Sequence, residues 1–124
     1  MNGTIFLRTS VIAFVLSMGF GAYMGGTHDF TYAPVHGHLN LIGGVLMFLA
    51  GLFYNSHPNL SPKLILAHYC IALLGLLLII PGIYGSIAVM PWAAPVVGLG
   101  SVVTIVSALV FAFMVYKGTG KAKA

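Results

Sequence analysis

Charged side chains are scarce in this chain of 124 residues: they make up 5% of it, and Asp29 is its only acid. Charged residues account for about a quarter of an ordinary soluble domain, so this chain has too few polar groups to coat a water-soluble surface. Its five scattered Lys and Arg residues do not form the basic patch of a nucleic-acid-binding protein. A soluble enzyme domain, a disordered segment and a nucleic-acid binder are therefore excluded.

Several reactive residue sets are missing as well. A single cysteine, Cys70, permits neither an intrachain disulfide nor a cysteine-based zinc site. The sequence contains no hydrolytic nucleophile set and no phosphate-binding glycine loop. No carboxylate lies inside an apolar stretch, which excludes a proton-coupled small multidrug exporter. Hydrophobic residues, in contrast, are abundant, at 60% of the chain. They indicate one small domain whose main partner is the lipid bilayer.

Four apolar stretches are long enough to cross about 30 Å of hydrocarbon, which takes about 20 helical residues. They cover about residues 5–24, 34–54, 64–80 and 92–116 of a single domain spanning 1–124. The third stretch either ends before Pro81 or continues past it. We expect Asp29 or Thr31 to cap the second helix, with Pro34 in its first turn. The first stretch is too long for a cleavable signal peptide, the rival interpretation. The predicted fold class is an all-α membrane protein with four transmembrane helices.

Positive charge predicts the orientation of these helices. Arg8 lies at the start of the first span, Lys63 lies between the second and third, and three lysines follow the fourth: Lys117, Lys121 and Lys123. Cations gather on the cytoplasmic side of membrane proteins, so both termini should be cytoplasmic. The loop with His28 and Asp29 should then face the outer side of a bacterial inner membrane.

Small residues recur at every fourth position in two of the expected helices. They are Ala13, Ser17, Gly21 and Gly25 in the first span, and Gly100, Thr104, Ala108 and Ala112 in the fourth. Such stripes allow two helix backbones to approach closely in lipid. We expect at least one stripe to pack within the bundle, and the other is a candidate interface between subunits.

Histidines are the main candidates for chemistry, because ionisable residues inside a bilayer are costly and usually functional. His36 and His38 lie near the outer end of the second span, two residues and therefore about 200° apart on a helix. Their rings should point to opposite sides and serve different sites. Three nearby glycines, Gly37, Gly43 and Gly44, leave room beside this helix for a flat or bulky group, which favours a ligand role over interfacial hydrogen bonding. His68, deeper in the third span, is expected to be a core residue bonded to a backbone carbonyl.

The segment Pro34-Val35-His36-Gly37-His38-Leu39-Asn40 resembles subunit I of haem–copper oxidases. In that family, a His-x-His pair on one membrane helix binds two different haems on opposite sides. Most of the chain also looks like small stand-alone membrane proteins described as oxidase subunit I-like. The family's catalytic subunit has twelve helices in three arcs of four, and the pair lies on the second helix of its arc, as it does here.

This resemblance implies that three copies form a twelve-helix homotrimer. His36 of one protomer and His38 of its neighbour would bind the iron of one haem b, with Asn40 and His28 as candidates for hydrogen bonds to ligands or propionates. The family's oxygen-reducing centre needs six histidines on four helices, which this chain lacks, so the resemblance implies electron transfer with a respiratory-chain partner but no oxygen reduction. No catalytic residue is therefore assigned.

Two other functions fit the same residues. His28, Asp29, His36 and, as a fourth group, His38 could form a copper site at the outer end, since imidazole suits copper. Alternatively, the chain is a non-catalytic accessory subunit of a respiratory complex, with interfacial histidines and small-residue stripes as its working surface.

Overall fold

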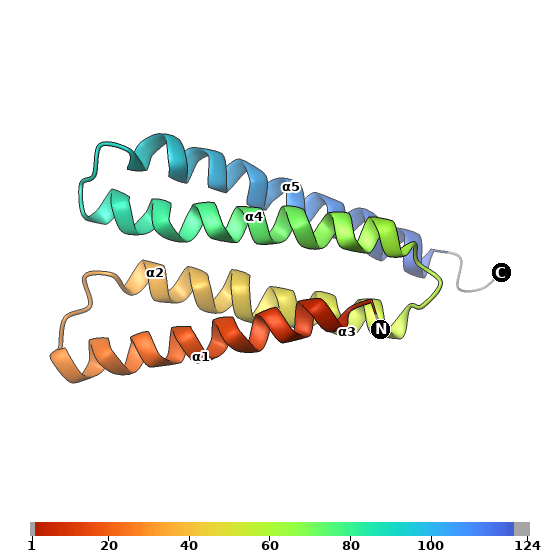
Figure 1. The fold of residues 1–124 in the computed structure, drawn as a ribbon, viewed down its shortest axis with the longest axis horizontal. Coiled ribbons are helices and arrows are strands. Elements are labelled where there is room, and N and C mark those ends of the chain that lie inside the picture. The colour runs from red at the N-terminus through yellow and green to blue at the C-terminus, as the bar shows by residue number, and fades with distance from the viewer. Residues whose placement is uncertain (1, 121–124) are drawn as a thin grey trace.

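The computed structural model describes residues 2–120 as helices joined by short turns, with no strand in that range. In chain order the helical segments are α1 (Thr4–Thr27), α2 (Ala33–His38), η1 (Leu39–Leu46), α3 (Met47–Ser56), α4 (Pro62–Ile87) and α5 (Ala93–Thr119). The segments α2, η1 and α3 follow one another without a break, so residues 33–56 form one rod (Figure 1). The described chain thus has four candidate membrane spans of 24 to 27 residues, which confirms the expected number and order.

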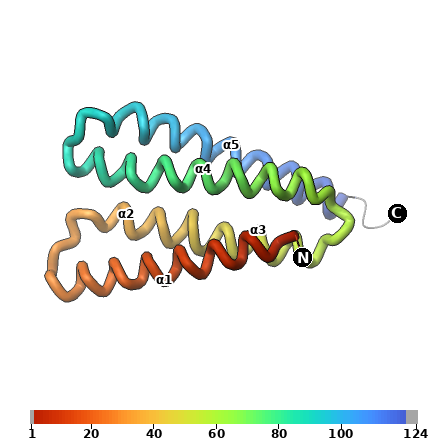
Figure 2. The backbone as a smooth tube through the Cα atoms, in the orientation of Figure 1, coloured from red at the N-terminus to blue at the C-terminus, as the bar shows by residue number. Residues whose placement is uncertain are grey.

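The four rods form two hairpins that run the length of the molecule (Figure 2). In one, α1 lies against the rod of α2, η1 and α3; in the other, α4 lies against α5 (Figure 1). Helix α1 begins and helix α5 ends at the same end of the bundle, as an even number of antiparallel spans requires (Figure 1). Helix α4 passes through Pro81 and ends at Ile87, so the longer of the two expected versions of this span is correct.

Bare glycine backbone lets α4 and α5 come together closely. A Cβ added to Gly100 would lie 2.7 Å from the backbone nitrogen of Ile79, and one added to Gly82 would lie 2.7 Å from Cα of Val97. No side chain at either position could fit unless a backbone moved. Close backbone approach replaces the hydrophobic driving force that helices lack in lipid.

Gly100→Ala is therefore expected to destabilise the α4–α5 hairpin by about 1–3 kcal/mol, because its methyl group meets backbone rather than a flexible side chain. Gly98→Ala is the matched control on the same helix, since a Cβ there meets nothing within 4 Å. Thermal unfolding in detergent would compare the two variants. Equal midpoints would mean that α5 does not pack on α4 through Gly100.

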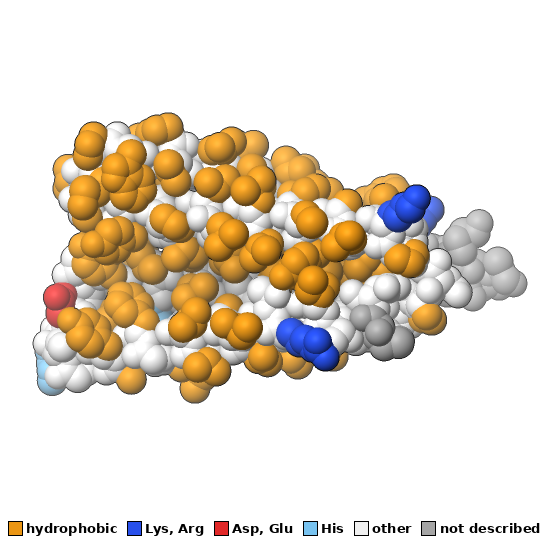
Figure 3. Space-filling view, viewed as in Figure 1, with side chains coloured by type: hydrophobic (Ala, Val, Ile, Leu, Met, Phe, Trp, Pro, Cys, Tyr) orange, Lys and Arg blue, Asp and Glu red, His pale blue; other side chains and the backbone are white. Residues whose placement is uncertain are grey.

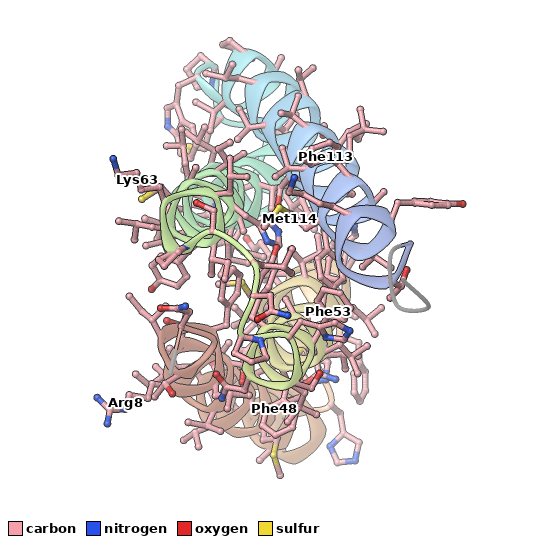
Figure 4. All side chains as sticks on the ribbon, turned by 90° about the vertical axis from the view of Figure 1, so that its right-hand side faces the viewer. Arg8, Phe48, Phe53, Lys63, Phe113 and Met114 are labelled. Atoms are coloured by element: carbon pink, nitrogen blue, oxygen red, sulfur yellow. The ribbon has the colours of Figure 1, made fainter. Side chains whose placement is uncertain are left out.

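The two hairpins share a hydrophobic core at the end of the bundle where α1 begins and α5 ends. This core consists of Phe6, Met47, Ala50, Tyr54, Leu60, Ile65 and Met114, drawn from α1, α3, α4, α5 and the loop before α4. Figure 4 looks onto this end: Met114 lies between the helices, whereas Arg8 and Lys63 extend away from the bundle. The core fixes how the second span sits against the third.

Much of the remaining surface is apolar (Figure 3), as expected for helices in contact with lipid. Large side chains such as Leu16, Leu77 and Leu109 are more than half exposed along the middle of their helices. Arg8, Lys63 and Lys117 lie near the start of α1, the start of α4 and the end of α5, whereas Asp29 lies in the loop between α1 and α2, at the opposite end of the bundle. Lys121 and Lys123 fall outside the described residues.

The small-residue stripe of α1 packs inside the protomer except at Gly25, which is exposed. Ala13 and Ser17 are buried, and a Cβ on Gly21 would meet the His36 ring. The stripe of α5 is divided: Gly100 and Thr104 face α4, whereas Ala108 and Ala112 are exposed. The expectation that at least one stripe serves ordinary packing is confirmed.

The start of the second span differs from expectation. Tyr32 occupies the N-cap position of α2 and makes no side-chain capping bond, while Pro34 stands in the first turn as expected. Asp29 instead accepts hydrogen bonds from the backbone nitrogen and the hydroxyl of Thr31, at 3.1 and 2.6 Å. Asp29 and Thr31, the two residues expected to cap the helix, therefore bond to each other in a turn within the loop.

A π-helical segment, η1, follows His38 directly. Its wider turns use i→i+5 hydrogen bonds; such turns are rare and are frequently found at functional sites. Here they bring two consecutive glycines against neighbouring helices: Gly43 lies beside Ala13 and Leu76, and Gly44 lies beside the ring of Phe14. The space expected beside these two glycines is therefore filled by the protein itself.

Candidate cofactor site

His36 is attached to α1 by a reciprocal pair of hydrogen bonds. Its Nδ1–H donates to the carbonyl oxygen of Ser17 at 2.8 Å, and the Ser17 hydroxyl donates to the carbonyl oxygen of His36 at 3.1 Å. Ser17 is fully buried, so this link is well shielded from solvent. The orientation of the ring is thus set by a second helix and not only by its own.

The place of the His36 ring depends on a glycine in α1. A Cβ on Gly21 would lie 2.8 Å from Cε1 of His36 and 3.4 Å from its Nε2. Any larger residue at this position would push the ring away from α1. The absence of a side chain at Gly21, in the small-residue stripe of the first span, thus makes room for the His36 imidazole.

His38 is exposed and is held by its own helix. Its Nδ1–H donates to the carbonyl oxygen of Pro34 at 2.7 Å. Gly37 separates the two histidines, and a Cβ there would meet nothing within 4 Å. The surface around His38 and Gly37 is therefore open to another molecule, unlike the surface at Gly43 and Gly44.

The His36 and His38 rings consequently leave the same nitrogen, Nε2, free of hydrogen bonds in the described chain. With Nδ1 donating to a carbonyl, neutral imidazole carries its lone pair on Nε2, and neither Nε2 makes a hydrogen bond in the described chain. A histidine that binds a metal ion nearly always donates its other ring N–H to a carbonyl or carboxylate in this way. His36 and His38 therefore each leave Nε2 without a hydrogen bond in the described chain, His36 on the side of α1 and His38 on the open side.

The remaining candidates do not join them. His28 ends α1 in a left-handed conformation, with φ of 56°, and its ring is exposed in the loop. Asn40 lies in η1, partly buried, and its side chain makes no hydrogen bond in the described chain. Among residues 2–120, no three His, Cys, Asp or Glu side chains gather closely enough to hold a metal ion. The four groups considered for copper are thus not assembled within one protomer.

His68 is a buried residue of the core, as expected, but its partner is not a carbonyl. The ring Nδ1 shares a 2.8 Å hydrogen bond with the hydroxyl of Tyr54. The ring of Phe111 stacks on it at 5.3 Å, and Phe6 lies 5.0 Å away. Because these aromatic neighbours enclose the imidazole, His68 is unsuited to share a cofactor with His36 or His38.

An apolar groove runs between the hairpins near the α1–α2 and α4–α5 loops. Its walls include Phe20, Tyr23 and Tyr32 on one side and Pro81 and Tyr84 on the other, and it encloses about 540 Å³. Tyr32 stacks on Tyr84 at 4.9 Å. Neither His36 nor His38 lines this groove, so a planar cofactor bound to their Nε2 atoms would lie on another part of the surface.

The turn before α2 allows a test of its geometry through acid titration. The Thr31 hydroxyl, and next its backbone N–H, donate to the Asp29 carboxylate and hold its pKa below the ordinary value of 3.8. A lowered folded-state pKa means that the turn is stabilised above pH 3.8 and loses this contribution as the pH falls through the lower, folded-state value. Thr31→Ala is expected to return the carboxyl pKa toward 3.8, as measured by NMR titration. An unchanged pKa would contradict the observed turn.

Sequence reasoning missed the two residues that hold the histidines. Ser17 was noted only as a small residue in a stripe, and Tyr54 only as the end of a span. Their spacing from His36 and His68 in the sequence carries no local signal, because each contact joins separate helices.

Comparison of the chain with protein-family models, curated proteins and solved structures found no match.

Proposed function

We propose that the protein is a membrane-embedded b-type haem protein that transfers electrons, with His36 and His38 as the iron ligands. The observation that carries the proposal is their shared geometry: each ring donates Nδ1–H to a backbone carbonyl and keeps Nε2 free. Two neutral imidazoles are a common axial pair for haem iron. The proposed haem would supply a one-electron couple, which the chain tunes through ligand orientation, hydrogen bonding and burial.

The placement of the two histidines supports sharing of each haem between protomers. His36 and His38 are two residues apart in the helical segment α2, so their rings leave the helix in opposed directions. One iron cannot easily take both ligands from the same chain. Each iron can instead take one histidine from one chain and its second histidine from a neighbouring chain. A cyclic assembly satisfies every ligand, and the resemblance to oxidase subunit I favours a trimer.

The charge distribution supports the proposed orientation. Arg8, Lys63 and Lys117 lie toward the end of the bundle where α1 begins and α5 ends, and we therefore place this end in the cytoplasm of a bacterial cell. The proposed haem would lie near the outer face of the inner membrane. His28 and Asn40, whose side chains make no hydrogen bond in the described part of the chain, are the candidates for contacts to the haem propionates. The electron partner would be a component of the respiratory chain.

Absorption spectroscopy of the detergent-purified protein tests the proposal directly. Haem is added to the oxidised protein, the excess is removed, and spectra are recorded before and after reduction. We expect a low-spin, six-coordinate b-type spectrum with one haem per chain, because each chain contributes one His36 and one His38. A colourless protein, or a high-spin spectrum at saturation, would contradict this function and favour an accessory subunit.

A further inference from the structure

A small polar cavity lies inside the bundle, away from the histidine pair. It encloses about 10 Å³. Three of its lining residues are polar: His68 on α4, and Thr104 and Ser107 on α5. The other walls are apolar and are formed by Phe6, Ile42, Leu46, Met47, Ala50 and Ala72. Polar groups from two helices thus meet at one point in an otherwise apolar interior.

Each of the three polar side chains brings an unpaired atom. The Thr104 hydroxyl is sealed from the surface and has no hydrogen-bond partner in the described chain. Ser107 is 5% exposed and its hydroxyl also makes no hydrogen bond there. His68 is 4% exposed, and the Tyr54 bond occupies only its Nδ1, so its Nε2 remains without a partner.

Such a set is costly in a dry interior. Leaving one buried donor or acceptor without a partner costs about 1–3 kcal/mol. The Thr104 hydroxyl is such a group, and His68 and Ser107 line the same space. A buried water typically makes about three hydrogen bonds to otherwise unsatisfied groups, and it needs at least about 10–15 Å³ of such volume. The cavity, at about 10 Å³, has the size and the polar lining for one water molecule.

We propose that this cavity is a binding site for a single structural water that bridges the imidazole of His68 to the hydroxyls of Thr104 and Ser107. Neutral imidazole has one donor and one acceptor nitrogen. When the Tyr54 hydroxyl donates to Nδ1, Nε2–H donates to the water; when Nδ1–H donates to Tyr54, the water donates to Nε2. The water can serve either arrangement, because it is both donor and acceptor.

The bound water completes a polar connection across the bundle. Tyr54 lies on α3, His68 on α4, and Thr104 and Ser107 on α5. The Tyr54–His68 bond joins the two hairpins, and the water joins α4 to α5 at the same depth. This site stands apart from the proposed haem ligands, so it does not depend on the proposed function.

Thr104→Val separates a hydrated cavity from a dry one, because valine matches threonine in shape and lacks its hydroxyl. With water bound, the variant removes one of its partners, and the unfolding midpoint falls by about 3–6 °C. In a dry cavity the same change removes an unsatisfied hydroxyl and raises the midpoint. Ser101→Ala is the control on the same helix, since Ser101 donates to the carbonyl of Val97. An unchanged or raised midpoint for Thr104→Val overturns the proposal.

A second measurement needs no variant. Wild-type protein in detergent micelles is labelled at histidine and threonine, and magnetisation transfer from water is recorded by NMR. We expect cross-peaks between a long-lived water and both the His68 ring and the Thr104 methyl group. Absence of these cross-peaks, in a sample where exposed His38 exchanges with water as expected, overturns the proposal.

Discussion

Replacing either His36 or His38 with alanine is expected to remove the low-spin haem spectrum completely. Each proposed haem takes one ligand from each position, so a single substitution deprives every site of a ligand. A protein with two independent sites would instead lose half of its haem in each variant. The measurement is the reduced-minus-oxidised spectrum of purified protein after haem addition. A normal low-spin spectrum in either variant would rule out the shared ligation.

Mixing the two variants tests whether the ligands come from different protomers. When His36→Ala and His38→Ala chains assemble together, some boundaries pair an intact His36 from one chain with an intact His38 from the next. Random mixing in a cyclic assembly restores about a quarter of the sites. No recovery in a mixed assembly of confirmed composition would mean that each iron does not draw its ligands from two chains.

Controls separate haem ligation from the general loss of a histidine. His57 donates Nδ1–H to the carbonyl of Phe53 at 2.8 Å, four residues back, much as His38 does to Pro34. It lies at the other end of the bundle, so His57→Ala should retain all haem. A second pair of variants tests the position of the His36 ring against α1. Gly21→Ala displaces the ring, whereas Gly19→Ala adds a methyl group to open space. Only the former should reduce haem affinity.

The helical architecture could be predicted because it depends on local properties of the sequence. Length and apolarity alone separate the four spans, and turn residues mark their ends. The observed spans extend a few residues beyond the predicted ones: α1, predicted for residues 5–24, covers Thr4–Thr27. The small-residue stripe of α1 also predicts close packing of this helix against another one, although it does not identify the partner helix.

What could not be predicted depends on contacts between helices. The π-helical turns of η1 exist where Gly43 and Gly44 fit against α1 and α4, and no local pattern announces such a fit. The expected free space beside these glycines was wrong for the same reason. Likewise, the opposed directions of the histidines follow from helical geometry, but the bond from His36 to Ser17 requires knowledge of which helix lies beside it.

Tyr54→Ala is expected to destabilise the protein by about 3–5 kcal/mol, because it removes a large buried aromatic side chain. Tyr54 is 1% exposed and lies within ring-stacking distance of Phe6, Phe53 and Phe111. Its removal would open a cavity at the point where the hairpins meet. Tyr116→Ala is the matched control, because Tyr116 is 78% exposed and should contribute little. Unfolding midpoints in detergent measure both.

Tyr54→Phe isolates the hydroxyl from the ring. The aromatic packing remains, but Nδ1 of buried His68 loses its partner at 2.8 Å, which should cost about 1–3 kcal/mol. Because this bond joins α3 to α4 and lies in the core rather than beside α2, the variant should unfold earlier while its haem spectrum stays that of the wild type. A midpoint equal to that of the wild type would show that the hydroxyl contributes nothing to holding the hairpins together. A lost haem spectrum in a folded variant would show instead that the core and the histidine pair act as one site, contrary to their separation in the structure.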